Sequence, residues 1–403
     1  MTGFSKQSVI DRTEETVLYT YRRFPVVFES GSGVTLKDTD GKEYLDFGSG
    51  IGVYALGYGN EAYGNALKSQ VDRLLHTSNL FYHPHLPEAA EKLLKASGLS
   101  RVFFTNSGTE AVEGAIKAAK KYAYLKDGKG DHEIIAMENS FHGRTVGSLS
   151  VTGTEHYREP FEPLMGGVKF ASFNDFDSVL DKVNEHTCAI ILETVQGEGG
   201  VTPAEPEFLE KVRALCDEKD IILIIDEIQC GMGRCGEYFA WQKYGVKPDI
   251  MTTAKALGGG VPVGAFVLGE KCAFSSLVPG DHGTTYGGNP FVCAAVSTVF
   301  DQFEELDVIG HVKKITPYFE QKLDELVSRY DFLTLRRGLG LMQGLVVSPE
   351  VPVGDIVSKC IENGLVVLSA GGNVIRLLPP LIIEENEIDQ MTDILDKVLS
   401  AFA

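Results

Sequence analysis

Two polar residues follow short apolar runs, at places where α/β proteins bind their ligands. Asp226 ends the run 221–225, which has the composition of a fully buried strand. Lys255 follows the run 249–254 and precedes a glycine run, so few side chains shield it. An acid at the carboxyl end of a strand faces the ligand crevice, and a desolvated lysine attacks carbonyl groups. Taken singly, each residue also fits an ordinary surface acid or a lysine at a helix start.

Two further segments carry side chains suited to a flat, anionic ligand. Ser107, Gly108 and Thr109 stand where a helical pattern begins, and free N–H groups and the helix dipole favour an anion there. The same residues also make an ordinary helix cap. In the segment FHGRT, Phe141 offers a face that can stack on a ring, and Arg144 offers a fork that can hold a carboxylate. A core phenylalanine and a surface arginine would have the same pattern.

A third glycine-rich segment, HGTTYGGNP, places Thr284 and Thr285 where hydroxyl and N–H groups can face a phosphate. A turn-rich loop without a ligand has the same composition. The pattern GMGRCG at 231–236 matches GxGxxG literally, but DEIQC separates it from its strand, and Asp249 begins a strand instead of ending one. The pattern therefore does not predict a dinucleotide site, and the sequence has no GxxxxGK[ST] stretch.

The order of the apolar runs predicts the elements that position these residues. Short strands around an Asp40-Gly41 turn predict an antiparallel meander over 26–47. Farther along, helical patterns alternate with short Ile-rich runs, which predicts an α/β fold with a mostly parallel sheet covered by helices. We expect a large domain and a small α+β domain built from both chain ends, with the small domain at 1–55 and 305–403 and the large domain at 56–304.

Composition excludes several classes of function. The chain has 403 residues, and its net charge of −19 repels nucleic acid and anionic membranes, so neither is an expected partner. The seven cysteines are irregularly spaced, which predicts no disulfide framework, and the isolated pair Cys230 and Cys235 predicts no metal. Residues 1–15 lack an apolar signal core and no run reaches transmembrane length, so we expect a cytoplasmic protein.

These segments, taken together and in order, resemble the class III aminotransferases of pyridoxal 5′-phosphate (PLP) fold type I. The resemblance covers nearly the whole chain and rests on SGTEAVEGAIKAA, FHGRT, QGEGG, DEIQCGMGR, TTAKALGGG and HGTTYGGNP. Among the subfamilies, HTSNLFY, TTAKALGGGVPVGA and IRLLPPL most resemble acetylornithine aminotransferases. The chain departs from the family pattern at Thr194, where proline is usual, at Cys230 and Cys235, where threonine is usual, and at Tyr54, where asparagine is common.

The resemblance implies PLP as the cofactor and assigns roles around it. Lys255 would hold PLP covalently and move the substrate proton, while Asp226 would keep the pyridine nitrogen protonated. Phe141 would stack on the ring, and Gln229 would reach the ring hydroxyl. The phosphate would be bound by Ser107, Gly108, Thr109 and Thr285. In this family Thr285 is expected from the neighbouring subunit, which implies a homodimer with shared sites.

For the substrates, the resemblance implies N-acetylornithine as amino donor and 2-oxoglutarate as acceptor. The products are N-acetylglutamate semialdehyde and glutamate, a step of arginine biosynthesis. Arg144 would hold the remote carboxylate of the donor, and Arg376 would hold the carboxylate that lies beside the reacting carbon of the acceptor. Glu198 would neutralise Arg376 until the acceptor arrives. Thr284 and Tyr21 are candidates for the pocket wall. Ornithine, 4-aminobutyrate or succinylornithine as donor, or a racemase of the same family, stay open as alternatives. A non-catalytic PLP protein would require loss of the lysine or the acid, and both are present.

Overall fold

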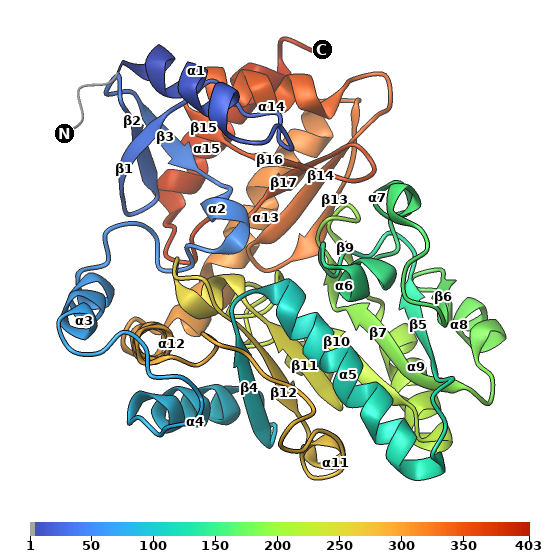
Figure 1. The fold of residues 1–403 in the computed structure, drawn as a ribbon. Coiled ribbons are helices and arrows are strands. Elements are labelled where there is room, and N and C mark those ends of the chain that lie inside the picture. Colours follow the sequence, from blue (N-terminus) through green and yellow to red (C-terminus); the bar gives the residue numbers. More distant parts are fainter. Residues whose placement is uncertain (1–4) are drawn as a thin grey trace.

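The computed structural model describes residues 5–403, and a seven-stranded sheet lies at its centre (Figure 1). The strands from β11 to β6 run parallel, whereas β12 lies antiparallel between β11 and β4. The order across the sheet is β4 (Arg101–Thr105), β12 (Gly264–Leu268), β11 (Ile250–Thr253), β10 (Ile222–Asp226), β7 (Thr187–Glu193), β5 (Glu133–Met137) and β6 (Val168–Ala171). The predicted α/β class with a mostly parallel sheet is confirmed; β6 is a strand that the sequence reading did not include.

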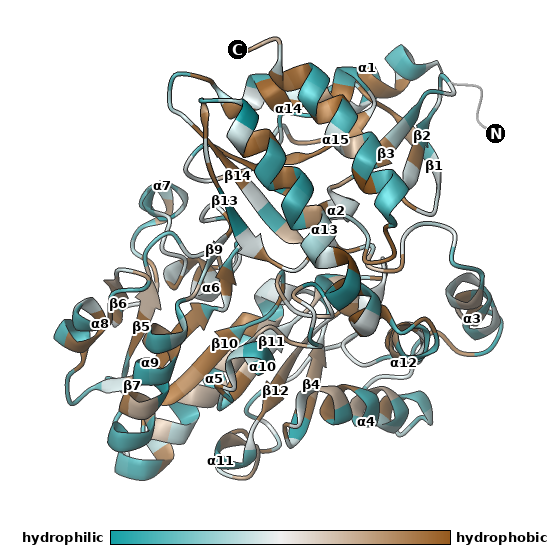
Figure 2. Cartoon of the chain, turned by 180° about the vertical axis from the view of Figure 1, so that it is seen from behind, coloured by the Kyte–Doolittle hydropathy of each residue, from teal (hydrophilic) through white to brown (hydrophobic). Residues whose placement is uncertain are grey.

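Helices cover both faces of this sheet, because successive side chains of a strand face opposite ways. In β10, Ile224 belongs to the core that α5 (Gly108–Asp127) helps to form, and the next residue, Ile225, belongs to the core that includes α9 (Pro206–Lys219). A continuous apolar run is what a strand buried on both faces needs. Figure 2 shows the result: the central strands are hydrophobic, and the surrounding helices turn hydrophilic residues outward.

Two smaller sheets form the other part of the molecule. The first is an antiparallel meander closed by a strand from the far end of the chain, where Leu365 pairs with Leu45. It contains β1 (Phe28–Ser32), β2 (Thr35–Asp38), β3 (Glu43–Asp46) and β15 (Leu365–Val366). The second contains β13 (Leu333–Leu339), β14 (Met342–Val347), β17 (Val374–Leu377) and β16 (Leu368–Ala370). The meander predicted at 26–47 is confirmed, while the exact domain boundaries remain predictions.

The other elements are short connections and outer helices. They are α1 (Lys6–Thr16), α2 (Ser49–Gly52), α3 (Glu61–Val71), α4 (His85–Ser97), α6 (Val146–Ser150), α7 (Glu155–Arg158), α8 (Phe176–Lys182), α10 (Trp241–Tyr244), α11 (Glu270–Ala273), α12 (Pro290–Glu305), α13 (Val308–Arg329), α14 (Val353–Glu362), α15 (Glu385–Leu399), β8 (Val195–Gln196) and β9 (Thr202–Pro203). All seven cysteines are free and buried. Within residues 5–403, no helix combines the length and apolarity needed to cross a bilayer.

Candidate active site

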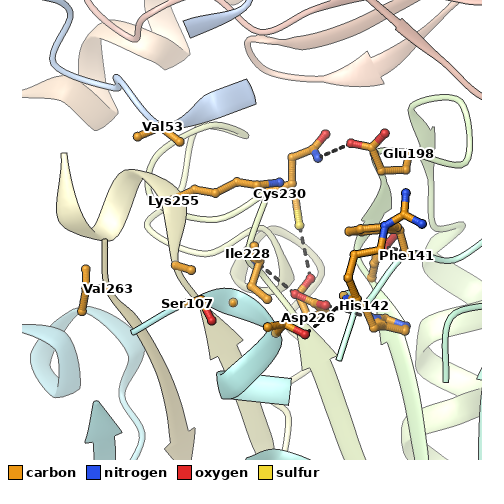
Figure 3. Close-up of a pocket in the computed structure, with 18 of the residues that line it drawn as sticks. Val53, Ser107, Phe141, His142, Glu198, Asp226, Ile228, Cys230, Lys255 and Val263 are labelled. Carbon is orange, nitrogen blue, oxygen red and sulfur yellow. Dashed lines mark hydrogen bonds and ion pairs between the residues drawn. The ribbon is translucent and has the colours of Figure 1, made fainter. Parts of the chain in front are cut away.

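Lys255 lies directly after β11, on the wall of a cavity of about 490 Å³ at the carboxyl end of the sheet (Figure 3). Its backbone is left-handed, with a φ of 47°, a conformation that costs a lysine free energy and is concentrated at functional sites. The Lys255 ammonium has no hydrogen-bond or ion-pair partner in residues 5–403. Burial lowers the pKa of this ammonium, against the attraction of Glu198. The cavity therefore contains a half-buried amine that gives up its proton more readily than a free lysine.

Asp226 ends β10 and is held in place by two donors. Its Oδ1 accepts the N–H of Ile228 at 3.0 Å, and its Oδ2 lies 2.8 Å from Nδ1 of His142. His142 is itself fixed, because its backbone N–H donates to the hydroxyl of Thr152. Figure 3 shows the imidazole and the carboxylate side by side below the cavity. The sequence reading used Phe141 and Arg144 from FHGRT and missed His142, although a histidine in that motif was the available signal.

A second acid, Glu193, ends the neighbouring strand β7 and is paired in register with Asp226. Its Oε1 accepts the N–H of Phe141 at 3.0 Å, and its Oε2 is buried without a partner. Burial, reinforced by the charge of Asp226, raises the pKa of Glu193 well above its ordinary value. Two neighbouring carboxylates in one buried site cannot both ionise cheaply. Of the two acids, Glu193 is thus the one whose charged form burial disfavours. Sequence reasoning missed it, although it ends an apolar run just as Asp226 does.

Arg376, on β17 of the smaller part, reaches the cavity wall through Glu198. Its Nη1 donates to Oε1 of Glu198 at 2.6 Å and to Oε1 of Gln229 at 3.0 Å. Burial acts to raise the pKa of Glu198, but the charge and hydrogen bond of Arg376 outweigh it and the pKa is lowered. The predicted neutralising contact is present. The amide of Gln229, expected to reach a ring hydroxyl, is occupied by Arg376 and Glu198 in this structure.

Arg144 also lines the cavity, but its guanidinium makes no hydrogen bond or ion pair within residues 5–403. It lies over aromatic rings instead, with Cζ 3.8 Å from the ring centroid of Tyr157 and 5.4 Å from that of Phe141. Tyr157 on α7 is a further residue that the sequence reading missed. The cavity is thus flanked by one neutralised arginine and one unpaired arginine.

Ser107, Gly108 and Thr109 form the start of α5, and all three line the cavity. The first N–H groups of a helix have no intrahelical acceptor and face whatever anion is nearby. The Ser107 hydroxyl accepts from the N–H of Glu110 at 3.4 Å, which is half of the anticipated helix cap. The carboxylate of Glu110 accepts from the N–H of Asn106 and not from that of Ser107.

Three predicted residues do not reach the cavity of their own chain. Thr284 accepts a hydrogen bond from the side chain of Asn106, which does line the cavity, at 3.3 Å. Thr285 is exposed, and Tyr21 is 70% exposed. These positions are near or outside the edge of the cavity, so within one chain they bind nothing there.

The site fits a flat, anionic carbonyl cofactor such as PLP. Lys255 is an unpartnered amine, Asp226 is a fixed carboxylate, and the start of α5 supplies anion-binding N–H groups. Gly143, with a φ of 137°, lets the backbone pass close to Thr109, whose Oγ1 would lie 2.3 Å from an added Cβ. Nε2 of His142 is buried without a partner, so the imidazole is held by Asp226 alone. The donor set and its burial agree with the group that the resemblance implies.

Known proteins match the chain over nearly its whole length. The family model "Aminotransferase class-III" matches residues 18–399. An acetylornithine aminotransferase of Clostridium acetobutylicum is 46% identical over 94% of this chain and 98% of its own.

Two solved structures superpose closely on this chain. An ornithine aminotransferase from Toxoplasma gondii has a TM-score of 0.95, 29% identity and coverage of 99% and 96% of the two chains. An acetylornithine aminotransferase from Elizabethkingia anophelis has a TM-score of 0.88, 30% identity and coverage of 99% and 100%. On this match, and with a lysine and a fixed acid lining one cavity, the chain belongs to the class III aminotransferases.

Proposed function

We propose that this enzyme transfers the terminal amino group of N-acetylornithine to 2-oxoglutarate. The observation that carries the proposal is the difference between the two arginines: Arg144 is unpaired, whereas Arg376 is neutralised by Glu198. A donor with one remote carboxylate needs one permanently available cation, and a second free cation would bind the wrong end of it. The name of the relatives that are 46% identical supports the same donor.

The cofactor of this family is PLP, which supplies the electron sink for the electron pair released when a substrate C–H bond breaks. Lys255 would hold it, and the start of α5 would bind its phosphate. Asp226 would keep a positive charge on the ring nitrogen, because a fixed carboxylate favours the protonated form of a neighbouring base. The Lys255 amine would act first as a base, which takes the proton from the substrate carbon, and then as an acid, which gives that proton back later in the reaction.

The substrates would be positioned in turn by the two arginines. Arg144 offers in-plane N–H donors to the remote carboxylate of the amino donor. The acceptor carries an additional carboxylate beside its reacting carbon, and Arg376 would take it when Glu198 moves aside. Glu198 has a lowered pKa and stays charged, so it neutralises Arg376 until an acceptor competes for it. Because Glu198 can neutralise Arg376 or release it, one cavity can bind both the donor and the acceptor.

We further propose a homodimer in which each cavity is completed by Thr285 of the partner subunit. In support, Leu80, Phe81 and Tyr82 are exposed, with Leu80 87% exposed, which is unusual for a surface that faces only water. The side chain of Asn79 donates to the carbonyl of Gly287 at 2.9 Å. This contact ties the exposed apolar segment to the threonine loop, so one surface carries both.

The experiment is paired half-reaction kinetics with acetylornithine, ornithine and 4-aminobutyrate, each followed by 2-oxoglutarate. Acetylornithine is expected to have the highest kcat/KM. Arg144→Lys should raise the KM of acetylornithine, and Arg376→Lys should impair the 2-oxoglutarate half-reaction more, because lysine cannot reproduce a two-point grip. If ornithine or 4-aminobutyrate exceeded acetylornithine by about tenfold in kcat/KM, or about 1.4 kcal/mol, the donor would be wrong.

A further inference from the structure

The guanidinium of Arg144 is held by aromatic faces alone. Its Cζ lies 3.8 Å from the ring centroid of Tyr157 and 5.4 Å from that of Phe141. The guanidinium has no hydrogen-bond acceptor among residues 5–403, in contrast to that of Arg376. An exposed arginine without a partner samples many rotamers, and fixing it on a ligand costs conformational entropy. Only the two rings restrict this arginine before a ligand arrives.

The short helix that carries Tyr157 is attached to the protein on both sides of this residue. Tyr157 lies on α7, and the adjacent Arg158 stacks on Phe170 of β6 with Cζ 4.1 Å from the ring centroid. At the start of the same segment, the N–H of Gly153 donates to both the carbonyl and the hydroxyl of Ser140. The short helix is thus attached at both ends. Tyr157 is a platform that does not have to move with the arginine above it.

Stacking leaves the binding edge of the guanidinium free. A cation–π contact uses the flat face of the group, whereas its N–H donors point outward in the plane. The rings of Tyr157 and Phe141 meet edge to face, with centroids 6.1 Å apart and an interplanar angle of 83°. Phe141 and Arg144 both line the cavity, so the rings hold the guanidinium of Arg144 at the cavity wall.

We propose that Tyr157 is a positioning residue that selects donors with a remote carboxylate, by holding Arg144 in its carboxylate-binding orientation. This inference rests on the proposed function of Arg144. Tyr157 does not touch the substrate; it acts through the arginine. The ring face carries the effect, because the Tyr157 hydroxyl has no hydrogen-bond partner among residues 5–403.

The test compares Tyr157→Leu, which removes the ring, with Tyr157→Phe, which keeps it. Tyr157→Leu should raise the acetylornithine KM about fivefold, in line with the loss of one cation–π contact, with kcat unchanged. Tyr157→Phe should stay within about twofold of wild type. Calorimetry with N-acetylnorvaline, which has the carboxylate but no amine to react, should show the same fivefold weakening.

Two controls separate this role from a general disturbance of α7. Phe170→Leu removes the ring beneath Arg158 and loosens α7 without changing Tyr157, so it should raise the acetylornithine KM less than Tyr157→Leu does; an equal loss there would assign the effect to displacement of α7. In an Arg144→Ala background, Tyr157→Leu should have no further effect on binding, because the two residues act as one unit.

The outcomes distinguish the inference from the proposed function. If Arg144→Ala leaves N-acetylnorvaline binding unchanged, the carboxylate grip itself is wrong. If Arg144→Ala weakens binding while Tyr157→Leu does not, only the role of Tyr157 is overturned. Equal losses in Tyr157→Leu and Tyr157→Phe would overturn it as well, since the ring face would then not be the cause.

Discussion

The floor of the cavity and its open edge are built in opposite ways. The floor is formed by the buried residues His142, Glu193 and Asp226 and by the half-buried Lys255. Its acids are fixed by backbone and imidazole donors. The open edge, formed by residues 76–82 and 282–288, carries exposed aromatic and aliphatic side chains and an exposed threonine. The first region is enclosed within one chain, whereas the second is the surface on which the proposed dimer would form.

Because the two regions are built differently, variants in them should affect different properties of the enzyme. On the floor, low dielectric strengthens every charge, so a change of one atom alters chemistry more than fold. At the open edge, Leu80, Phe81, Tyr82 and Thr285 are exposed, so a change there should act through assembly. The following predictions test this division, beginning with the largest expected effect.

Lys255→Ala should abolish turnover, with a loss of at least about four decades, because both the covalent anchor and the proton carrier are removed. Steady-state kinetics measure the loss, and borohydride reduction followed by peptide mapping of the wild-type protein should locate the cofactor on Lys255. Lys314→Ala, an exposed lysine on α13, is the matched control and should behave as wild type. Turnover by Lys255→Ala at the wild-type rate would remove this residue from the mechanism.

Asp226→Asn should cost about two to three decades in kcat, because the charge that keeps the ring nitrogen protonated is lost. Glu193→Gln should cost far less, because the amide has the shape of the carboxyl and burial raises the pKa of Glu193, which disfavours its charged form. Thermal unfolding of both variants should remain close to wild type. Equal losses in the two variants would show that the floor does not divide its charge in this way.

At the open edge, the test is complementation between two inactive chains. A Lys255→Ala chain mixed with a Thr285→Glu chain should regain about a quarter of wild-type activity, because half of the dimers are mixed and each has one intact site. Mixing Lys255→Ala with Asp226→Asn is the control: both residues belong to the same cavity, so no intact site can form. A fully active monomer in sedimentation would contradict shared sites.

Much of the fold was predictable, because buried strands are continuous apolar runs and helices repeat at their own period. For the same reason Asp226 and Lys255 could be found at the ends of such runs. His142 and Glu193 were present in segments with such signals, but their roles depend on β10, β7 and β5 being neighbours, and strand order is a long-range property. Tyr157 could not be predicted for a similar reason, because its partner Arg144 lies on another segment and the two side chains meet through a stacking contact.

Thr194 departs from the family pattern, and the structure gives the departure a partner. Its hydroxyl donates to Oε1 of Glu227 at 2.8 Å. The carboxyl of Glu227 is completely buried and also accepts the N–H groups of Ala240 and Trp241. Burial raises the pKa of Glu227 to about 7, and these donors, which stabilise the charged form, hold it from rising further. Thr194 thus supplies one of the hydrogen bonds that make a buried charge tolerable.

Loss of the hydrogen bond between Thr194 and Glu227 should have the smallest effect, and it should change the stability of the protein. Because the folded pKa of Glu227 is raised, the native state binds more protons than the unfolded state between the unfolded pKa and about 7. Stability is therefore highest below this window and falls as pH rises through it, by up to about 1.4 kcal/mol per pH unit for this group.

Thr194→Val removes a donor to the charged form of Glu227 and should raise the pKa of Glu227 further. The variant should be destabilised by about 1–2 kcal/mol at pH 8 and by less at pH 5, where Glu227 is protonated with or without the hydroxyl. Urea unfolding at the two pH values measures the difference, with exposed Thr334→Val as the control. A loss in Thr194→Val that is the same at both pH values would mean that its hydroxyl does not act through the charge of Glu227.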